Sequence, residues 1–117
     1  MIRLAKNYKQ GSLSLATIAK EEKISLGYLE RLVAKLKSKG LVKSSKGIKG
    51  GYILSRQPKQ ISIKEIFEAL EGSIAPFYCV EPKNFCSRKN CSARVVWEKL
   101  DGEIKKTLGK ITLKDLI

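Results

Sequence analysis

ISLGYLERLVAKLKSKGLVKSSKGIKGGYILS, residues 24–55, contains the signals for a helix and for a β-hairpin directly after it. Ser25 is a good N-cap, because its hydroxyl can accept a hydrogen bond from the free backbone N–H groups of the first turn. Gly40 stands where the end of a helix favours a residue with positive φ. Between them, apolar residues recur at helical spacing, which predicts a buried stripe of Leu26, Leu29, Leu32, Val33 and Leu36.

The hairpin is predicted from two short apolar runs, residues 41–42 and 52–54, that flank a turn rich in lysine and glycine. Upstream, Ser14 can cap a shorter helix with apolar residues at Leu15, Ile18 and Ala19. Two short helices joined by KEEKIS match the length of a helix-turn-helix. A helix-turn-helix followed by a basic hairpin is a winged helix, in which the second helix enters the major groove of DNA.

Two further helices are predicted downstream. The first is capped by Ser62, with Glu65 placed for a capping box, and should bury Ile63, Ile66, Phe67 and Leu70. The second, SARVVWEKLDGEIKKTLGK, has apolar residues at every fourth position: Val96, Leu100, Ile104 and Leu108. This long stripe could fold back on its own domain or pair with its copy in a dimer. We favour a homodimer, because a reader of two DNA half-sites needs a two-fold axis.

The predicted fold is therefore mainly α with a small β-hairpin wing, an α+β chain. We expect a winged helix-turn-helix domain at residues 1–72, a cysteine loop at 73–92, and a dimerisation helix with a short C-terminal turn at 93–117. The N-terminus lacks the long apolar stretch of a secretory signal, and no apolar run approaches the ~18 residues that a membrane span needs. These features predict a soluble, cytoplasmic protein with no membrane partner.

Charge is concentrated in the first half of the chain. Residues 1–60 contain 14 basic and 3 acidic side chains, a net charge of +11, whereas residues 61–117 contain 10 and 8, a net charge of +2. Such asymmetry is typical of a nucleic-acid partner. A solubilising surface would not favour one half, and no basic segment has a broad apolar face left for an anionic membrane. The complete lack of His also removes the commonest general base, and we expect no enzyme.

The order of these elements resembles the winged helix-turn-helix of the Rrf2-type transcription regulators, a family that includes the iron–sulfur cluster regulator IscR and the nitric-oxide sensor NsrR. The similarity lies in IAKEEKISLGYLERLVAKLKSKGLVKSSKGIKGGYILS and continues through ISIKEIFEALEG, three cysteines, VVWEKL and ITLKDLI. It covers nearly the whole chain beyond position 12 and implies a DNA-binding homodimer.

The resemblance also implies which residues face double-stranded DNA. These are Ser25, Tyr28, Glu30 and Arg31 on the helix, and Lys46 with Gly50 and Gly51 in the wing; Gly27 and Lys35 share the helix stripe, and Lys49 lies beside the hairpin tip. Residue chemistry supports these roles independently. Arg31 can read guanine with two hydrogen bonds, and Glu30 can accept one from cytosine N4. The helix N-terminus at Ser25 suits a phosphate.

The same resemblance implies that Cys79, Cys86 and Cys91 ligate an iron–sulfur cluster, [2Fe–2S] or [4Fe–4S]; thiolate is the usual ligand of such clusters. Two features depart from the family pattern. Arg94 stands where the IscR type has a histidine ligand, and the first strand and helix of the pattern are missing before Ile2. We expect either a truncated or misassigned start, or a fourth position filled by solvent or a small molecule.

Other interpretations of the cysteines remain open. A zinc site would usually need four ligands at tighter spacing, and free thiols could sense oxidants or alkylating agents directly. We therefore predict a homodimeric, sequence-specific DNA-binding regulator that senses redox, nitric-oxide or iron–sulfur status through a cluster. The alternatives are a DNA-binding repressor controlled by a protein partner or by thiol modification, and an electron-transfer or cluster-carrier protein.

Overall fold

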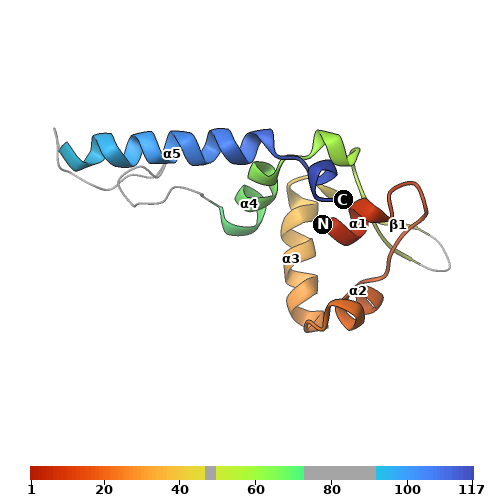
Figure 1. Ribbon diagram of the computed structural model, residues 1–117. Helices are drawn as coiled ribbons and strands as arrows, with labels where there is room; N and C mark the ends of the chain where they lie inside the picture. Colours follow the sequence, from red (N-terminus) through yellow and green to blue (C-terminus); the bar gives the residue numbers. More distant parts are fainter. Residues whose placement is uncertain (47–49, 73–91) are drawn as a thin grey trace.

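The computed structural model describes residues 1–46, 50–72 and 92–117 (Figure 1). Its elements confirm the predicted mainly helical chain with one small hairpin in the described residues. In chain order they are α1 (Ile2–Lys6), α2 (Leu15–Glu22), α3 (Leu26–Ser38), β1 (Val42–Ser45), β2 (Gly51–Leu54), the 3-10 turn η1 (Pro58–Gln60), α4 (Ile63–Glu71), α5 (Ser92–Lys110) and the 3-10 turn η3 (Leu113–Leu116).

Local capping fixes the helix-turn-helix as the sequence predicts. The Ser14 hydroxyl accepts a hydrogen bond from the Thr17 backbone N–H at 3.1 Å, and the Ser25 hydroxyl accepts one from the Tyr28 backbone N–H at 3.2 Å. Gly40 follows α3 with a φ of +73°. These bonds satisfy amide groups that a helix end otherwise leaves without a partner. Both helix starts are therefore set by residues within a few positions of them.

The hairpin is antiparallel, with Val42 opposite Leu54 and Ser45 opposite Gly51. It is attached to the segment before α2 by a two-way backbone bridge. The Leu13 N–H donates to the Tyr52 carbonyl at 3.1 Å, and the Tyr52 N–H donates to the Leu13 carbonyl at 2.8 Å. The wing is thus hydrogen-bonded to the chain that enters the helix-turn-helix.

A single core joins the helix-turn-helix, the hairpin and the C-terminal turn. Ile61 and Leu113 are fully buried, and the Leu113 N–H donates to the Ile61 carbonyl at 3.0 Å. The core also contains the inner stripe of α3: Leu29, Val33 and Leu36. Two predicted core residues are exposed instead, Leu26 (42%) and Phe67 (47%). Leu26 is exposed because it lies in the first turn of α3, before the part of the helix that packs into the core. Phe67 is exposed because only Ile66 and Ala69 of α4 are buried, so the buried face of α4 is narrower than its apolar stripe.

α5 extends away from the rest of the molecule as a long rod (Figure 1). None of its residues is buried, and Val95, Val96 and Leu100 are exposed by 54%, 56% and 41%. Among the described elements it packs mainly against α4, and the molecule measures 59 × 27 × 23 Å. Among the described residues, no helix combines the length and the apolar character that a membrane crossing requires.

Candidate nucleic-acid interface

The outward stripe of α3 is the exposed surface of the helix-turn-helix. Because Leu29, Val33 and Leu36 turn inward, the opposite side of the helix is left in solvent: Ser25, Gly27, Tyr28, Glu30 and Arg31. The Tyr28 side chain is 50% exposed, and the Arg31 guanidinium lies 6.0 Å from the centre of its ring. A planar cation beside an exposed aromatic ring suits the edges of bases in a groove.

The N-terminus of α3 offers a polar surface next to this stripe. Ser25 accepts the Tyr28 N–H through its side-chain oxygen, which leaves its own hydroxyl proton as a donor. The N-terminal end of a helix also has partial positive charge. This end can therefore position a phosphate while Arg31, further along the helix, contacts a base.

Lys35 has a partner inside the protein. Its Nζ donates a hydrogen bond to the Leu70 carbonyl at 3.3 Å, which places the ammonium group at the C-terminal end of α4. The last carbonyls of a helix lack intrahelical partners and attract cations. Lys35 thus connects α3 to the end of α4, and no spacing rule in the sequence signals this contact.

The hairpin contributes a basic edge. Lys46 and Gly50 are exposed on either side of the tip, and the predicted contact Lys49 lies outside the described residues. Gly51 has a packing role in β2, since a Cβ at this position would lie 2.5 Å from the Leu13 carbonyl oxygen. Lys37 Nζ donates to the Ser44 hydroxyl at 3.3 Å and joins α3 to β1.

Ion pairing leaves few free acidic side chains near the outward stripe of α3 and the hairpin. Arg3 pairs with Glu21, and its Nε lies 3.7 Å from a Glu22 carboxylate oxygen. Two of the three acidic side chains in residues 1–60 are therefore engaged by a cation of α1, and the third is Glu30 on the outward stripe of α3. An acidic group there would repel phosphates, which favours a base-reading role for Glu30.

The three predicted cluster ligands, Cys79, Cys86 and Cys91, lie outside the described residues. In the described part of the chain, no three His, Cys, Asp or Glu side chains gather into a metal site. Arg94 Nε lies 4.0 Å from a Glu98 carboxylate oxygen on the next turn of α5. The donor chemistry fits an iron–sulfur cluster at three positions, since three thiolates are available within thirteen residues, but the chain has no His for a fourth.

Comparison with known proteins gives one consistent result. A family model described as "Rrf2: Iron-dependent Transcriptional regulator" matches residues 1–117. The chain is 38% identical over 116 residues to the HTH-type transcriptional regulator CymR of Bacillus subtilis, covering 99% of this chain and 80% of that protein.

Solved structures agree with the sequence comparison. The structure of CymR, the global cysteine regulator of B. subtilis, matches with a TM-score of 0.82 and 36% identity over 98% of this chain and 84% of that one. IscR of T. potens matches with a TM-score of 0.80 and 37% identity over 98% of this chain and 75% of that one. These similarities extend over the helix-turn-helix, the hairpin and the long helix together.

Proposed function

We propose that this chain, which belongs to the Rrf2 family of transcriptional regulators, reads double-stranded DNA as a homodimer and responds to a signal at its cysteines. Its relatives CymR and IscR regulate transcription, so the chain is a DNA-binding regulator and not an enzyme. The observation that carries the proposal is the exposed stripe of α3, where Tyr28 and Arg31 lie beyond a capped helix N-terminus.

The second copy is proposed to pack on α5. α5 has nineteen residues and no buried side chain, and Val96 and Leu100 are about half exposed. A helix gains most of its stability by packing its apolar face, so we expect this face to be covered by a partner. Pairing α5 with its copy would cover that stripe and relate two α3 helices by a two-fold axis. Two half-sites one helical turn apart could then be read together.

The signal is proposed to act at Cys79, Cys86 and Cys91, which would hold an iron–sulfur cluster. When bound, such a cluster supplies a centre whose oxidation state and ligands respond to oxygen, nitric oxide and iron supply. The chain's own contribution is mechanical. Residues 73–91 follow α4 after the single residue Gly72, and the end of α4 is hydrogen-bonded to Lys35 of α3. A shift of α4 would therefore move the recognition helix, and a coupling of about 1–3 kcal/mol would change DNA affinity by roughly 5- to 150-fold.

Control by the thiols alone, without a cluster, is the second candidate. Its support is the similarity to CymR, a global cysteine regulator, together with the absence of His from the whole chain. A thiol pair that oxidises reversibly could change the same segment without iron. The two candidates share the reading surface and differ only in what occupies the cysteines.

Protein purified without air separates them. We would record the visible absorption and the iron and sulfide content, and then measure binding to DNA from upstream of its own gene by fluorescence anisotropy, with a random duplex of equal length as the control. The cluster is supported if the wild-type protein is coloured and its DNA affinity changes when the cluster is lost, while the variant with all three cysteines replaced by serine shows no such change. A colourless protein whose affinity changes with diamide and recovers with dithiothreitol supports thiol control. If DNA affinity changes neither on cluster loss nor on treatment with diamide, sensing at the cysteines is ruled out.

Lys35→Met tests the connection to α3. Methionine keeps most of the length of the lysine side chain but cannot donate to the Leu70 carbonyl. Lys37→Met is the matched control, because Lys37 lies on the same helix and bonds Ser44 of the hairpin instead. We expect Lys35→Met to lower the ratio of DNA affinities between the two signal states about two- to tenfold, and Lys37→Met to leave that ratio unchanged. Equal effects of the two variants would contradict the proposed connection.

A further inference from the structure

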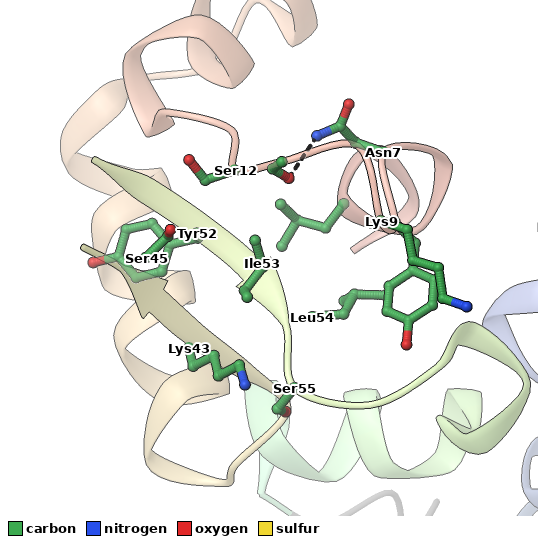
Figure 2. A pocket seen from close by; sticks show the side chains of 12 residues that line it. Asn7, Lys9, Ser12, Lys43, Ser45, Tyr52, Ile53, Leu54 and Ser55 are labelled. Carbon is green, nitrogen blue, oxygen red and sulfur yellow. Dashed lines mark hydrogen bonds between the residues drawn. The ribbon is translucent and has the colours of Figure 1, made fainter. Parts of the chain in front are cut away.

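A cavity of about 390 Å³ lies between the turn that follows α1 and the outer side of the hairpin (Figure 2). Lys9, on the turn, and Lys43, on β1, stand on opposite sides of it, with Ile53 and Leu54 between them. Its volume is in the range of small-molecule sites, which are typically apolar with a few well-placed polar groups. No residue of α3 lines the cavity, so among the described residues it is separate from the outward stripe of that helix.

The lining of this cavity is positively charged. It includes two lysines and no acidic residue among the described side chains. Serine hydroxyls and Tyr52 add polar groups, while Leu4, Ile53 and Leu54 form an apolar surface. A cavity lined by two lysines and by an apolar surface favours an anion with a hydrophobic body, because each part of the ligand can then meet a matching group.

The turn that presents Lys9 is closed by a side-chain hydrogen bond. Asn7 Nδ2 donates to the Gly11 carbonyl at 2.9 Å and closes the turn. Lys9 has a φ of +66°, which is uncommon for a residue other than glycine, and its Nζ lies 5.8 Å from the centre of the Tyr8 ring. Such backbone conformations persist where the surrounding structure enforces them, and they are concentrated at ligand sites.

We propose that this cavity binds a small organic anion, a carboxylate or a phosphate ester with an apolar body, and that its occupation changes DNA affinity through the hairpin. The anion would join Lys9 of the turn to Lys43 of β1. The adjoining Leu13–Tyr52 bridge already connects the segment after this turn to β2, the partner strand of β1, by two backbone hydrogen bonds of 3.1 and 2.8 Å. A ligand across this junction would restrict the orientation of the wing relative to α3 and so add a second input to the regulator.

Binding is tested on the full chain with naphthalene-2-carboxylate and phenyl phosphate, and with naphthalene-2-carboxamide as the neutral counterpart. Amide chemical shifts followed by NMR should map saturable binding of at least one anion to residues 7–13 and to both strands. The amide and the double variant Lys9→Asn/Lys43→Gln should each bind about tenfold more weakly. Asparagine tolerates positive φ, so the turn is expected to keep its fold. Lys106→Gln, an exposed lysine of α5, is the matched control and should bind like the wild type.

The DNA assay decides between a small anion and the phosphate backbone. If the cavity serves a small anion, the double variant binds upstream DNA within about twofold of the wild type, and the anion shifts the affinity only of the wild type and Lys106→Gln. If the lysines instead contact DNA phosphates, the double variant lowers the salt dependence of DNA binding by about two charges, and the proposal fails. It fails equally if the neutral amide binds as well as the anions, or if neither anion binds.

Discussion

Gly51→Ala should destabilise the protein, because β2 approaches the backbone of the Leu13–Ser14 segment too closely for a side chain. The added Cβ would lie 2.5 Å from the Leu13 carbonyl oxygen, 2.7 Å from its carbonyl carbon and 3.1 Å from the Ser14 nitrogen. All three are backbone atoms, so no flexible side chain can move aside. Relief requires opening the Leu13–Tyr52 bridge, whose two backbone hydrogen bonds measure 3.1 and 2.8 Å.

The magnitude follows from two opposing effects. Opening the bridge loses two backbone hydrogen bonds at a cost of about 1–3 kcal/mol, and keeping it closed would instead cost a similar amount in overpacking. Replacing glycine by alanine also restricts the unfolded chain and returns about 0.4–1 kcal/mol. We therefore expect the free energy of unfolding to fall by about 1–2 kcal/mol, with weaker DNA binding because the wing loses its attachment.

Gly102→Ala is the matched control, since it is the same substitution in the middle of α5, where no described atom outside the helix's own backbone lies within 4 Å of the added Cβ. There alanine should raise stability by about 0.5–1 kcal/mol, as expected from helix propensity. Urea unfolding followed by circular dichroism, at one protein concentration for all variants, measures both effects. A lower free energy of unfolding for Gly51→Ala together with a higher one for Gly102→Ala would support the close approach at β2. A Gly51→Ala variant as stable as the wild type would refute it.

Three further predictions concern the reading surface, the dimer and acid stability. Arg31→Lys keeps the charge but cannot form two hydrogen bonds to one base, so it should weaken the free energy of binding to the preferred DNA by about 1–3 kcal/mol and leave the salt dependence of binding unchanged. A larger loss of affinity on random DNA than on the preferred DNA would contradict base reading. Leu100→Lys should yield a folded monomer by light scattering, since this side chain is 41% exposed within the chain; an unchanged dimer would exclude α5 pairing at this position. Burial raises the pKa of Glu65, but hydrogen bonds from the Ser62 backbone N–H and from Arg56 outweigh it and hold the pKa below its usual value. The stability that this carboxylate contributes is present above the unfolded-state pKa and lost as the pH falls through the lower, folded-state pKa. In Glu65→Gln, the free energy of unfolding measured with urea should therefore fall less steeply below about pH 4.5 than in the wild type. An identical pH dependence in the two proteins would count against the capping box.

The sequence predicted the features that depend on neighbouring residues. The caps at Ser14, Ser25 and Ser62 and the positive φ at Gly40 are decided within a few positions, and all four are confirmed. Apolar periodicity located the helices but overestimated the buried width of α4, because the exposure of Phe67 depends on which surface the other elements provide.

Contacts between distant segments were beyond the sequence. Lys35 fits the outward stripe of α3 by its spacing, yet its ammonium group reaches the Leu70 carbonyl, 35 positions away. The family resemblance assigns Gly51 to the DNA-facing wing, whereas its lack of a side chain is required by a segment that precedes α2. In both cases the determining partner is set by tertiary packing, and no local pattern encodes it. The DNA contacts and the cysteine ligands remain predictions.

The size of the proposed coupling indicates which contacts between α3 and α4 must transmit it. A single exposed hydrogen bond such as that of Lys35 contributes about 0.5–1.5 kcal/mol, which is at most half of the upper value expected for allosteric coupling. The remainder requires packing, and Ile66 and Ala69 are the buried residues of α4, which lies against α3. Close-packed side chains have few alternative arrangements, so a displacement of α4 would move α3 as a body rather than deform the interface. Lys35→Met should for this reason weaken the response to the signal without abolishing it, and a variant that enlarges Ala69 should alter that response even though it touches neither DNA nor cysteine.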